Sequence, residues 1–475
     1  MRERILITAS IILLCTITVL RLLYPSPFAA TWDEVDFALA LDNYDISFMQ
    51  PHFPGYPFFI LGGMIAHIWI ENPAEALSMF NTIAVASSAV PVYMLARRRV
   101  SSGEALLLAA FLQSGSYLSI LATQPMSEGA ALAVLWWYIW SLDRAFQMNR
   151  LLEQILPLAL FALLMGIRLS YAPFGIALPL LWLYDWRRKK NRVIPLISLA
   201  VFFQLVWVGA LIWNVGGIDG FFKLAFGFVG GHFTEWGGAV TETSEPLSSR
   251  LYRLVALNIF WTGLFSRSPL LAGIFILLLA FLVLQWKNLR LRKTLYENRL
   301  ILLLALVYFL WNLFAQNIDK PRHSYPIVML LSFSFVMLQL KQRYLFLVFA
   351  FAVCQAAFGI FLAKEQATAE PATYQLANFL TEKEKPLTVY TWEETRVMGY
   401  LQVPYEHKRF YQYDYFLQDK KYRTDDTIYV TNHLIDGFRS QGIEVEAHLQ
   451  EVKRFRSNPL FDPIYSEIIL YKWIP

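Results

Sequence analysis

The stretch that decides the fold is ILITASIILLCTITVLRLL at residues 5–23, which carries a single charged residue, Arg21. A helix that crosses a bilayer needs about 20 mostly apolar residues, so this stretch is long enough to span a membrane. Tyr24-Pro25-Ser26-Pro27 follows it, without the small residues of a signal-peptide cleavage site. We therefore expect the stretch to stay in the protein as a first membrane helix.

Comparable apolar stretches recur through the first 363 residues. Of all 475 residues, 56% are hydrophobic and 16% are charged, whereas about 25% are charged in a soluble protein. We expect eleven membrane spans, at about 5–23, 76–96, 104–121, 127–145, 153–168, 170–185, 193–213, 269–286, 300–316, 325–340 and 344–363. Two shorter or interrupted stretches, 57–70 and 251–265, are expected to be juxtamembrane helices that do not cross.

The positions of the basic residues support this choice. Basic loops stay on the cytoplasmic side of a membrane, and the clusters are Arg2/Arg4, Arg97–Arg99, Arg144/Arg150, Arg187–Arg192, Lys287–Arg299 and Lys341/Arg343. With 57–70 and 251–265 kept out of the membrane, 19 Lys/Arg of this part lie inside and eight outside. The N-terminus is then cytoplasmic, and two long loops, 24–75 and 214–268, face outward.

The composition changes near residue 364. Residues 364–475 hold 31 charged residues in 112 positions, against 46 in the 363 before them. We therefore divide the chain into an all-α polytopic membrane domain, 1–363, and a small C-terminal α/β domain, 364–475, that is extracytoplasmic. The expected elements of the α/β domain are a helix at 371–382, a strand at 387–391, a β-α-β unit at 427–431, 432–440 and 444–449, and a last strand at 467–473.

Several classes of function are disfavoured. The net charge is only +5, and no stretch mixes basic and aromatic residues as nucleic-acid binding would require, so we expect no nucleic-acid partner. The two cysteines, Cys15 and Cys354, lie in apolar runs and do not indicate a disulfide framework. No asparagine begins an Asn-x-Ser/Thr site, which fits the plasma membrane of a bacterium.

The first outward loop carries the most informative residues. It contains TWDEVDF at 31–37 and QPHFPGYP at 50–57, so three carboxylates stand within four residues directly after a span. Thr31 and Glu34 have the spacing of a capping box, and acids in a first helical turn favour the helix dipole. Asp33 and Asp36, one turn apart, would project together from the start of this helix.

These two motifs resemble the first-loop pattern of GT-C glycosyltransferases, in particular the protein O-mannosyltransferase and aminoarabinose-transferase group (family 39-like). That pattern is Phe-Asp-Glu-x-His-Phe followed by His-Pro-Pro-Leu, in an outer loop whose next apolar helix does not span. Two positions depart from it, because Asp36 stands where the family has histidine and Phe53 where it has the first proline. The match of motifs covers about residues 31–60, and the match of topology about 5–363.

The resemblance implies an integral membrane GT-C enzyme. Such an enzyme moves one sugar, a hexose or a pentose, from a polyprenyl-phosphate donor to an acceptor hydroxyl at the outer face, with inversion. The acceptor must lose a proton, and a positioned carboxylate can take it as general base. By family position this carboxylate is Asp33, while Glu34 would hold the acceptor or a divalent cation. Glu128, at the outward start of the predicted span 127–145, resembles the second acidic site of the superfamily.

The leaving phosphate needs cationic or N–H donors. Arg322 and His323, in Lys320-Pro321-Arg322-His323, occupy a place where the family often has a basic-aromatic pair in contact with the lipid phosphate. Arg168 lies at an outward helix end and is a further candidate. We also expect the loop residues Asp36 and His52 to contact substrate.

A metal requirement stays open at this point. Carboxylate and imidazole ligands would suit a divalent cation, and the candidates are Glu34, His52 and His232, although no HxxH or HExxH spacing supports them.

Other open points are the sugar, and whether the acceptor is a protein, a lipid or a wall glycan. The rival classes are a lipid-linked-sugar flippase or transporter, and a scaffold that presents the C-terminal domain. Neither would need Asp33 and Glu34 to line a cavity.

Overall fold

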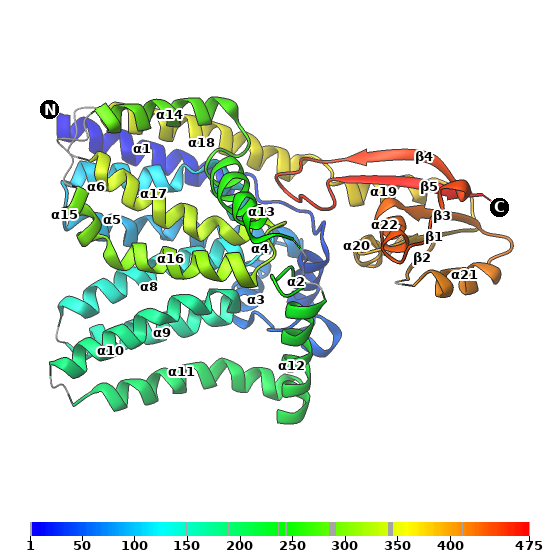
Figure 1. Ribbon diagram of the computed structural model, residues 1–475, viewed down its shortest axis with the longest axis horizontal. Coiled ribbons are helices and arrows are strands. Elements are labelled where there is room, and N and C mark those ends of the chain that lie inside the picture. The colour runs from blue at the N-terminus through cyan, green and yellow to red at the C-terminus, as the bar shows by residue number, and fades with distance from the viewer. Residues whose placement is uncertain are drawn as a thin grey trace.

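The computed structural model describes residues 2–148, 150–188, 191–235, 237–242, 245–284, 291–340, 345–410 and 412–474. Parts of the predicted basic clusters lie outside these ranges, as do the ends of two predicted spans: 189–190, 287–290 and 341–343, and 285–286 and 344. Figure 1 shows a bundle of helices with an α/β domain at one end.

The helices of the bundle are mainly apolar, as helices surrounded by lipid and by other helices are, except for the charged segment 291–297. They are α1 (Arg2–Leu22), α4 (Pro73–Ser87), α5 (Ala89–Arg97), α6 (Ser102–Gln113), α7 (Ser116–Thr123), α8 (Glu128–Gln147), α9 (Leu151–Ile167), η2 (Leu169–Ile176), α10 (Ala177–Arg187), α11 (Val193–Asn214), α14 (Pro269–Leu284), α15 (Leu291–Glu297), α16 (Arg299–Ala315), α17 (Tyr325–Gln339) and α18 (Leu345–Thr368). Among the described residues, four helices are long and apolar enough to cross a membrane, or seven if each bent pair is one span. The expected number of eleven therefore stays a prediction.

Further helices lie at the end of the bundle that faces the α/β domain, which we call the site end (Figure 1). They are α2 (Trp32–Asp42), η1 (Ile46–Phe48), α3 (Pro57–His67), α12 (Ile218–Thr234), α13 (Leu247–Tyr252), the π-helical η3 (Arg253–Leu264) and η5 (Pro321–Ser324). With eleven residues, α3 is about 16 Å long, roughly half of a bilayer core. The segment 247–264 meets α14 at a bend of 104°. Both geometries agree with helices that do not cross.

The basic loops lie at the opposite end of the bundle. Glu3 accepts a hydrogen bond from the backbone N–H of Gly103 at 2.8 Å, and Arg99 donates to the carbonyl of Glu297 at 2.6 Å. The first contact joins the start of α1 to the start of α6, and the second joins the loop after α5 to the end of α15, far from the α/β domain in Figure 1. The grouping agrees with the charge asymmetry, and which side is cytoplasmic stays a prediction.

The C-terminal domain is built on a five-stranded sheet in the order β2-β1-β3-β5-β4. Its elements are α19 (Ala372–Thr381), β1 (Leu387–Thr391), α20 (Glu394–Tyr400), β2 (Glu406–Arg409), α21 (Tyr413–Lys421), β3 (Thr427–Thr431), α22 (Asn432–Ser440), η6 (Glu446–His448), β4 (Leu449–Arg456) and β5 (Glu467–Trp473). β1, β2 and β3 are parallel, with Val389 beside Tyr429, and β5 is antiparallel to β3 and β4. Val389 packs on the face covered by α19, and Tyr390 on the face covered by α21 and α22.

The predicted strand at 444–449 is wrong. Residues 446–448 form the turn η6, and the strand β4 begins at Leu449. β3 pairs with β1 and β5 and not with β4, the next strand along the chain. The segment 427–449 is therefore not a β-α-β unit. β4 lies at the edge of the sheet, and of its eight residues, all described, Phe455 alone is buried. An edge strand can expose both faces, so its charged sequence lacks the apolar alternation that identifies a strand.

The C-terminal domain rests on α2. Val35 and Ala38 of α2 share a small apolar core with Val397 of α20. The hydroxyl of Thr373 in α19 donates to the carbonyl of Ala30, just before α2, at 3.1 Å. The first loop of the membrane part is therefore covered by the soluble domain.

This arrangement predicts the sidedness of three exposed positions. In a C15A/C354A background, we expect Ser47→Cys and Glu384→Cys to react with a membrane-impermeant maleimide in intact cells. Arg98→Cys should react only after permeabilisation, because it lies at the opposite end of the bundle. Equal labelling of positions 98 and 47 in intact cells would show that α3 crosses the membrane after all.

Candidate active site

The site begins at the first turn of α2, whose start is fixed by a reciprocal cap. The hydroxyl of Thr31 accepts from the backbone N–H of Glu34 at 3.3 Å, and Oε2 of Glu34 accepts from the N–H of Thr31 at 3.1 Å and of Ala30 at 2.8 Å. This confirms the predicted capping box. The cap holds Glu34 against the backbone and leaves Asp33, on the same turn, directed away from it.

Of the three acids in the first-loop motif, Asp33 is the one that stays accessible. Its side chain is 31% exposed, and Oδ2 lies 3.1 Å from Nη2 of Arg322 and 3.9 Å from Nζ of Lys320. Burial alone would raise the pKa of Asp33, but Lys320, His52, Arg322 and Arg168 together hold this pKa well below its usual range. Asp33 is therefore a carboxylate at every physiological pH.

Arg322 connects Asp33 to a second, buried carboxylate. Nε of Arg322 lies 2.8 Å from Oε1 of Glu128, and Nη2 of Arg168 lies 3.0 Å from the same oxygen. Arg168 also donates to the hydroxyl of Ser127 at 2.8 Å. The side chain of Glu128 is 1% exposed. Four residues singled out from the sequence (Asp33, Glu128, Arg168 and Arg322) thus form one charged cluster.

The local chain explains why these side chains reach one place. Glu128 begins α8 after the Gln124-Pro125 turn, and Arg168 ends α9 in an extended conformation. Arg322 lies in η5, a single turn that starts at Pro321. All are at helix ends, where the backbone leaves the bundle. With Lys320, which the sequence had marked only as a neighbour of Arg322, the cluster has three cations and two carboxylates, and so one excess positive charge.

Asp36 and His52, expected to contact substrate, are engaged by protein groups. Asp36 is 0% exposed; its Oδ2 lies 3.0 Å from Nδ1 of His52, and its Oδ1 accepts from Nε of Arg396 at 2.9 Å. His52 Nε2 lies 3.1 Å from the hydroxyl of Tyr56. Arg396 belongs to α20 of the C-terminal domain and was not predicted, because nothing near it in sequence indicates a partner.

The imidazole of His323 contacts the protein backbone. Its Nδ1 lies 3.2 Å from the carbonyl oxygen of Asn317. Burial, and then the cations Arg168 and Arg322, lower the pKa of His323 well below its ordinary value. The imidazole is therefore neutral, and the positive charge beside Asp33 comes from the arginines and Lys320.

The metal candidates do not converge. Glu34 bonds the backbone of its own cap, His52 lies against Asp36 and Tyr56, and His232 lies 2.8 Å from the carbonyl of Ala315. Within the described ranges, no three His, Cys, Asp or Glu side chains are placed to hold an ion together. The candidate residues that the structure describes therefore do not fit a shared metal site.

A cavity of about 50 Å³ lies between the two domains, and Glu34 is part of its wall. Its lining includes Thr31, Glu34, Asp462 and Tyr465. Oδ2 of Asp462 is buried and accepts no hydrogen bond from any residue that the structure describes. Burial raises the pKa of Glu34 to about 7, the N–H of Ala30 opposes this shift, and the charge of Asp462 adds to it. Glu34 therefore changes its protonation state near neutral pH.

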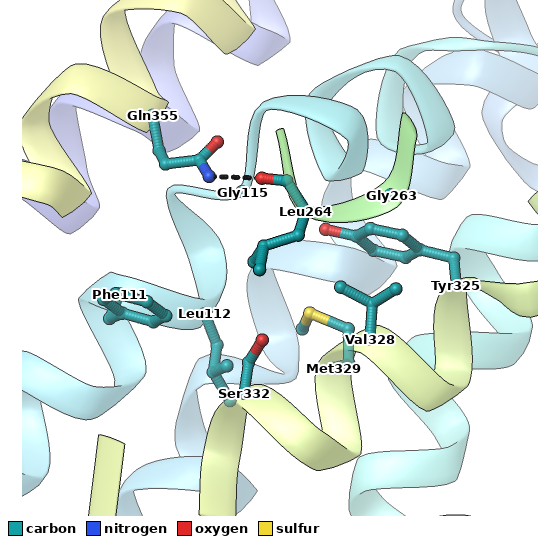
Figure 2. Close-up of a pocket in the computed structure, with 10 residues that line it drawn as sticks. All are labelled: Phe111, Leu112, Gly115, Gly263, Leu264, Tyr325, Val328, Met329, Ser332 and Gln355. Atoms are coloured by element: carbon teal, nitrogen blue, oxygen red, sulfur yellow. Dashed lines mark hydrogen bonds between the residues drawn. The ribbon is translucent and has the colours of Figure 1, made fainter. Parts of the chain in front are cut away.

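A second cavity, of about 20 Å³, lies deeper in the bundle between α6, η3, α17 and α18 (Figure 2). Its lining is mostly apolar, and the amide of Gln355 crosses it to donate to the carbonyl of Leu264 at 2.6 Å. None of the ten lining residues is a predicted site residue. This cavity marks imperfect packing beside the π-helical segment.

The structure is similar to solved structures of GT-C membrane glycosyltransferases. It matches ArnT from Cupriavidus metallidurans bound to undecaprenyl phosphate with a TM-score of 0.56 and 11% identity, over 97% of each chain, and apo ArnT with a TM-score of 0.57. It matches the Archaeoglobus fulgidus oligosaccharyltransferase in complex with Zn and sulfate with a TM-score of 0.50 and 13% identity, over 89% of this chain and 67% of that one. No family model and no curated protein matches the sequence. The chain has the GT-C fold, which confirms the fold expected from the first-loop motifs.

The raised pKa of Glu34 predicts a pH-dependent stability. The folded state holds the Glu34 proton more tightly than the unfolded state, whose pKa is near 4.5. The stabilisation is full below pH about 4.5 and is lost as the pH rises through about 7, on the order of 3 kcal/mol in total. Glu34→Gln keeps the oxygen that accepts from Ala30 and removes the proton.

We therefore expect the unfolding temperature of Glu34→Gln in detergent, relative to wild type, to rise from about pH 5 to about pH 8. Glu451→Gln, at an exposed position of β4, should show no such rise. A difference between Glu34→Gln and wild type that does not change with pH would contradict the assignment.

Proposed function

We propose that the protein is a glycosyltransferase that moves one sugar from a polyprenyl-phosphate donor to an acceptor hydroxyl at the site end of the bundle. Asp33 is the general base, and Arg322, with Arg168 and Lys320, holds the donor phosphate. The reaction is a single displacement with inversion. The acceptor is a protein, a lipid or a wall glycan, and the setting is a bacterial plasma membrane with the site end outward.

The observation that carries this proposal is the shared contact of Arg322 with Asp33 and Glu128. An accessible carboxylate, a buried carboxylate and three cations meet at the site end of the bundle. A flippase or a scaffold has no need for an accessible carboxylate beside a cationic site. A transferase needs both, one for the acceptor proton and one for the leaving phosphate.

Burial distinguishes Asp33 from its neighbours in the motif. Glu34 is 8% exposed and occupied by the cap, and Asp36 is 0% exposed with both oxygens engaged. Neither can reach an acceptor without breaking its contacts. In this proposal Glu34 fixes the start of α2, and Asp33 carries the chemistry.

In the proposed chemical step, Asp33 takes the proton of the acceptor and the cations stabilise the leaving phosphate. The acceptor O–H gives its proton to Asp33 while the oxygen forms a bond to C1 of the sugar. The bond between C1 and the phosphate oxygen breaks, and its electron pair leaves with the polyprenyl phosphate. The phosphate thereby gains one negative charge, which Arg322 and Lys320 are placed to stabilise as it develops.

The same cations make the base dependent on the donor. Without an anion, Lys320 and Arg322 keep the pKa of Asp33 low, and Asp33 is a weak base. A donor phosphate that binds these cations adds negative charge and raises the pKa of Asp33 towards its ordinary value. Asp33 becomes a better proton acceptor when the sugar is present to be transferred.

The fold supports the choice of donor. The ArnT structure of similar fold holds undecaprenyl phosphate, a polyprenyl phosphate. The cations of this chain lie at helix ends, which supports binding of a lipid phosphate whose chain stays in the membrane. Mass spectrometry of lipid-linked sugars and surface glycans in a deletion strain will identify the sugar and the acceptor.

Asp33→Asn tests the base. Asparagine keeps the size of the side chain and its place at the start of α2 but cannot take the proton. General-base assistance is typically worth 10²–10⁴-fold, so we expect transfer to fall by at least about 100-fold. The measurement is transfer by the folded, detergent-solubilised variant from the lipid-linked sugar that the deletion strain identifies. Asp42→Asn, at the exposed end of the same helix, is the control, and near-normal transfer by Asp33→Asn would falsify the mechanism.

Arg322→Ala tests the phosphate site. Loss of a charged hydrogen bond costs about 1.5–3 kcal/mol, so we expect the affinity for undecaprenyl phosphate to fall by roughly 10- to 150-fold. Arg168 still pairs with Glu128 in this variant, which protects the fold. Arg253→Ala, whose partners Glu245 and Asp319 lie outside the cluster, should bind normally. Unchanged affinity in Arg322→Ala would rule out this contact.

A further inference from the structure

Among the contacts between the C-terminal domain and the helix that carries Asp33, the side chain of Arg396 makes an ion pair with Asp36. Its guanidinium lies 2.9 Å from Oδ1 of Asp36 through Nε and 2.7 Å through Nη2, which also donates to the carbonyl of Met49 at 3.0 Å. On the other side, His52 lies 3.0 Å from Oδ2 of Asp36. Asp36 therefore connects three parts of the protein: α2, the loop after it and α20.

Because Asp36 is buried, its carboxylate depends on the ion pair with Arg396. The carboxylate is 0% exposed, and a buried charge without a partner is strongly destabilising. If Arg396 is removed, Asp36 keeps His52 but loses its permanently charged partner. The carboxylate must then take up a proton or turn towards water, and either change acts on α2.

Further contacts from the C-terminal domain fix the same helix. The guanidinium of Arg396 lies 5.5 Å, and that of Arg409 4.9 Å, from the ring centre of Trp32, the residue before Asp33. The ring of Trp392 lies under Arg409 at 4.3 Å. A guanidinium over the face of an aromatic ring is attracted by the ring's negative face. The first turn of α2 is thus held from the side of the soluble domain.

Helix geometry links these contacts to the reacting group. Asp33 and Asp36 are three residues apart and lie on one side of α2. An eleven-residue helix has little stability of its own, so its rotation and position are set by what it contacts. A change at Asp36 therefore moves Asp33 relative to Arg322, which belongs to the membrane part.

We propose that Arg396 is a positioning residue of the active site, and that the C-terminal domain completes the site by holding α2 through the Arg396–Asp36 ion pair. The inference rests on the proposed function for its effect on transfer. Its structural part, the order of α2, does not depend on that function. Arg396 does not touch the Arg322–Glu128–Arg168 contacts, so phosphate binding should not depend on it.

The test compares Arg396→Met, which keeps much of the aliphatic stem, with Arg396→Lys, which keeps the charge. The control is Arg454→Met, whose arginine pairs with Glu451 on the exposed strand β4. The first measurement is hydrogen–deuterium exchange of residues 31–42 in the full-length protein in detergent. We expect exchange to be faster by about tenfold in Arg396→Met, partly restored in Arg396→Lys and unchanged in Arg454→Met.

The second measurement separates turnover from phosphate binding. A displacement of about 1 Å at a reacting group can cost on the order of 100-fold in rate, so turnover of Arg396→Met should fall by about 10- to 100-fold. Its affinity for undecaprenyl phosphate should stay within about twofold of wild type. The double variant Asp36→Asn/Arg396→Met, which leaves no unpaired charge, should be more ordered at 31–42 than Arg396→Met.

The outcomes distinguish the two proposals. Exchange and turnover of Arg396→Met equal to those of Arg454→Met would overturn the positioning role. Loss of phosphate binding together with turnover would also overturn it, because the residue would then act on the whole site. If wild type transfers no sugar, the proposed function fails, and the exchange measurement still decides whether Arg396 orders α2. If Arg396→Met does not fold, Arg396→Lys and the double variant carry the same comparison.

Discussion

Glu128 is a carboxylate with 1% of its side chain exposed at the end of an apolar bundle, and the geometry of the site follows from the need to neutralise it. Two guanidinium groups do so, Arg168 from the end of α9 and Arg322 from η5. Removing one partner of a buried pair costs several kcal/mol, so these elements are fixed relative to α8. Arg322 also contacts Asp33. The arginine that neutralises the buried carboxylate of Glu128 therefore also lies beside the accessible carboxylate of Asp33.

The three acids of the first-loop motif show how burial separates residues of similar chemistry. Asp33 is 31% exposed, Glu34 8% and Asp36 0%, although they lie within four positions. Each has a different partner: a cation of the membrane part, the backbone of its own helix cap, and an arginine of the soluble domain. A short helix with two of its acids anchored in this way presents the third in one direction. The soluble domain is therefore part of what orients the site.

The sequence predicted the elements whose signals are local. The strands at 387–391, 427–431 and 467–473 and the helix at 432–440 agree with the structure. They are buried on at least one face, so their apolar pattern is plain. The capping box was equally readable, because it involves residues three positions apart. The strand β4 was missed because an edge strand needs no apolar face, and the bend of 64° between α6 and α7, inside the predicted span 104–121, was missed because hydropathy does not report the direction of a helix.

For the site, the sequence by itself indicated four residues of the charged cluster as candidates, and their catalytic and binding roles stay predictions. Asp33, Glu128, Arg168 and Arg322 are charges at the ends of apolar helices, and charges are costly there unless they have a use. The tertiary structure decided how they combine. Asp33 and Arg322 are 289 positions apart, and Asp36 and Arg396 are 360 apart. No periodicity encodes such a pairing, because it depends on which helix ends meet in space and on where the soluble domain comes to rest. For the same reason, the sequence named Asp36 as a candidate, and only the fold showed that an arginine from the far end of the chain buries it.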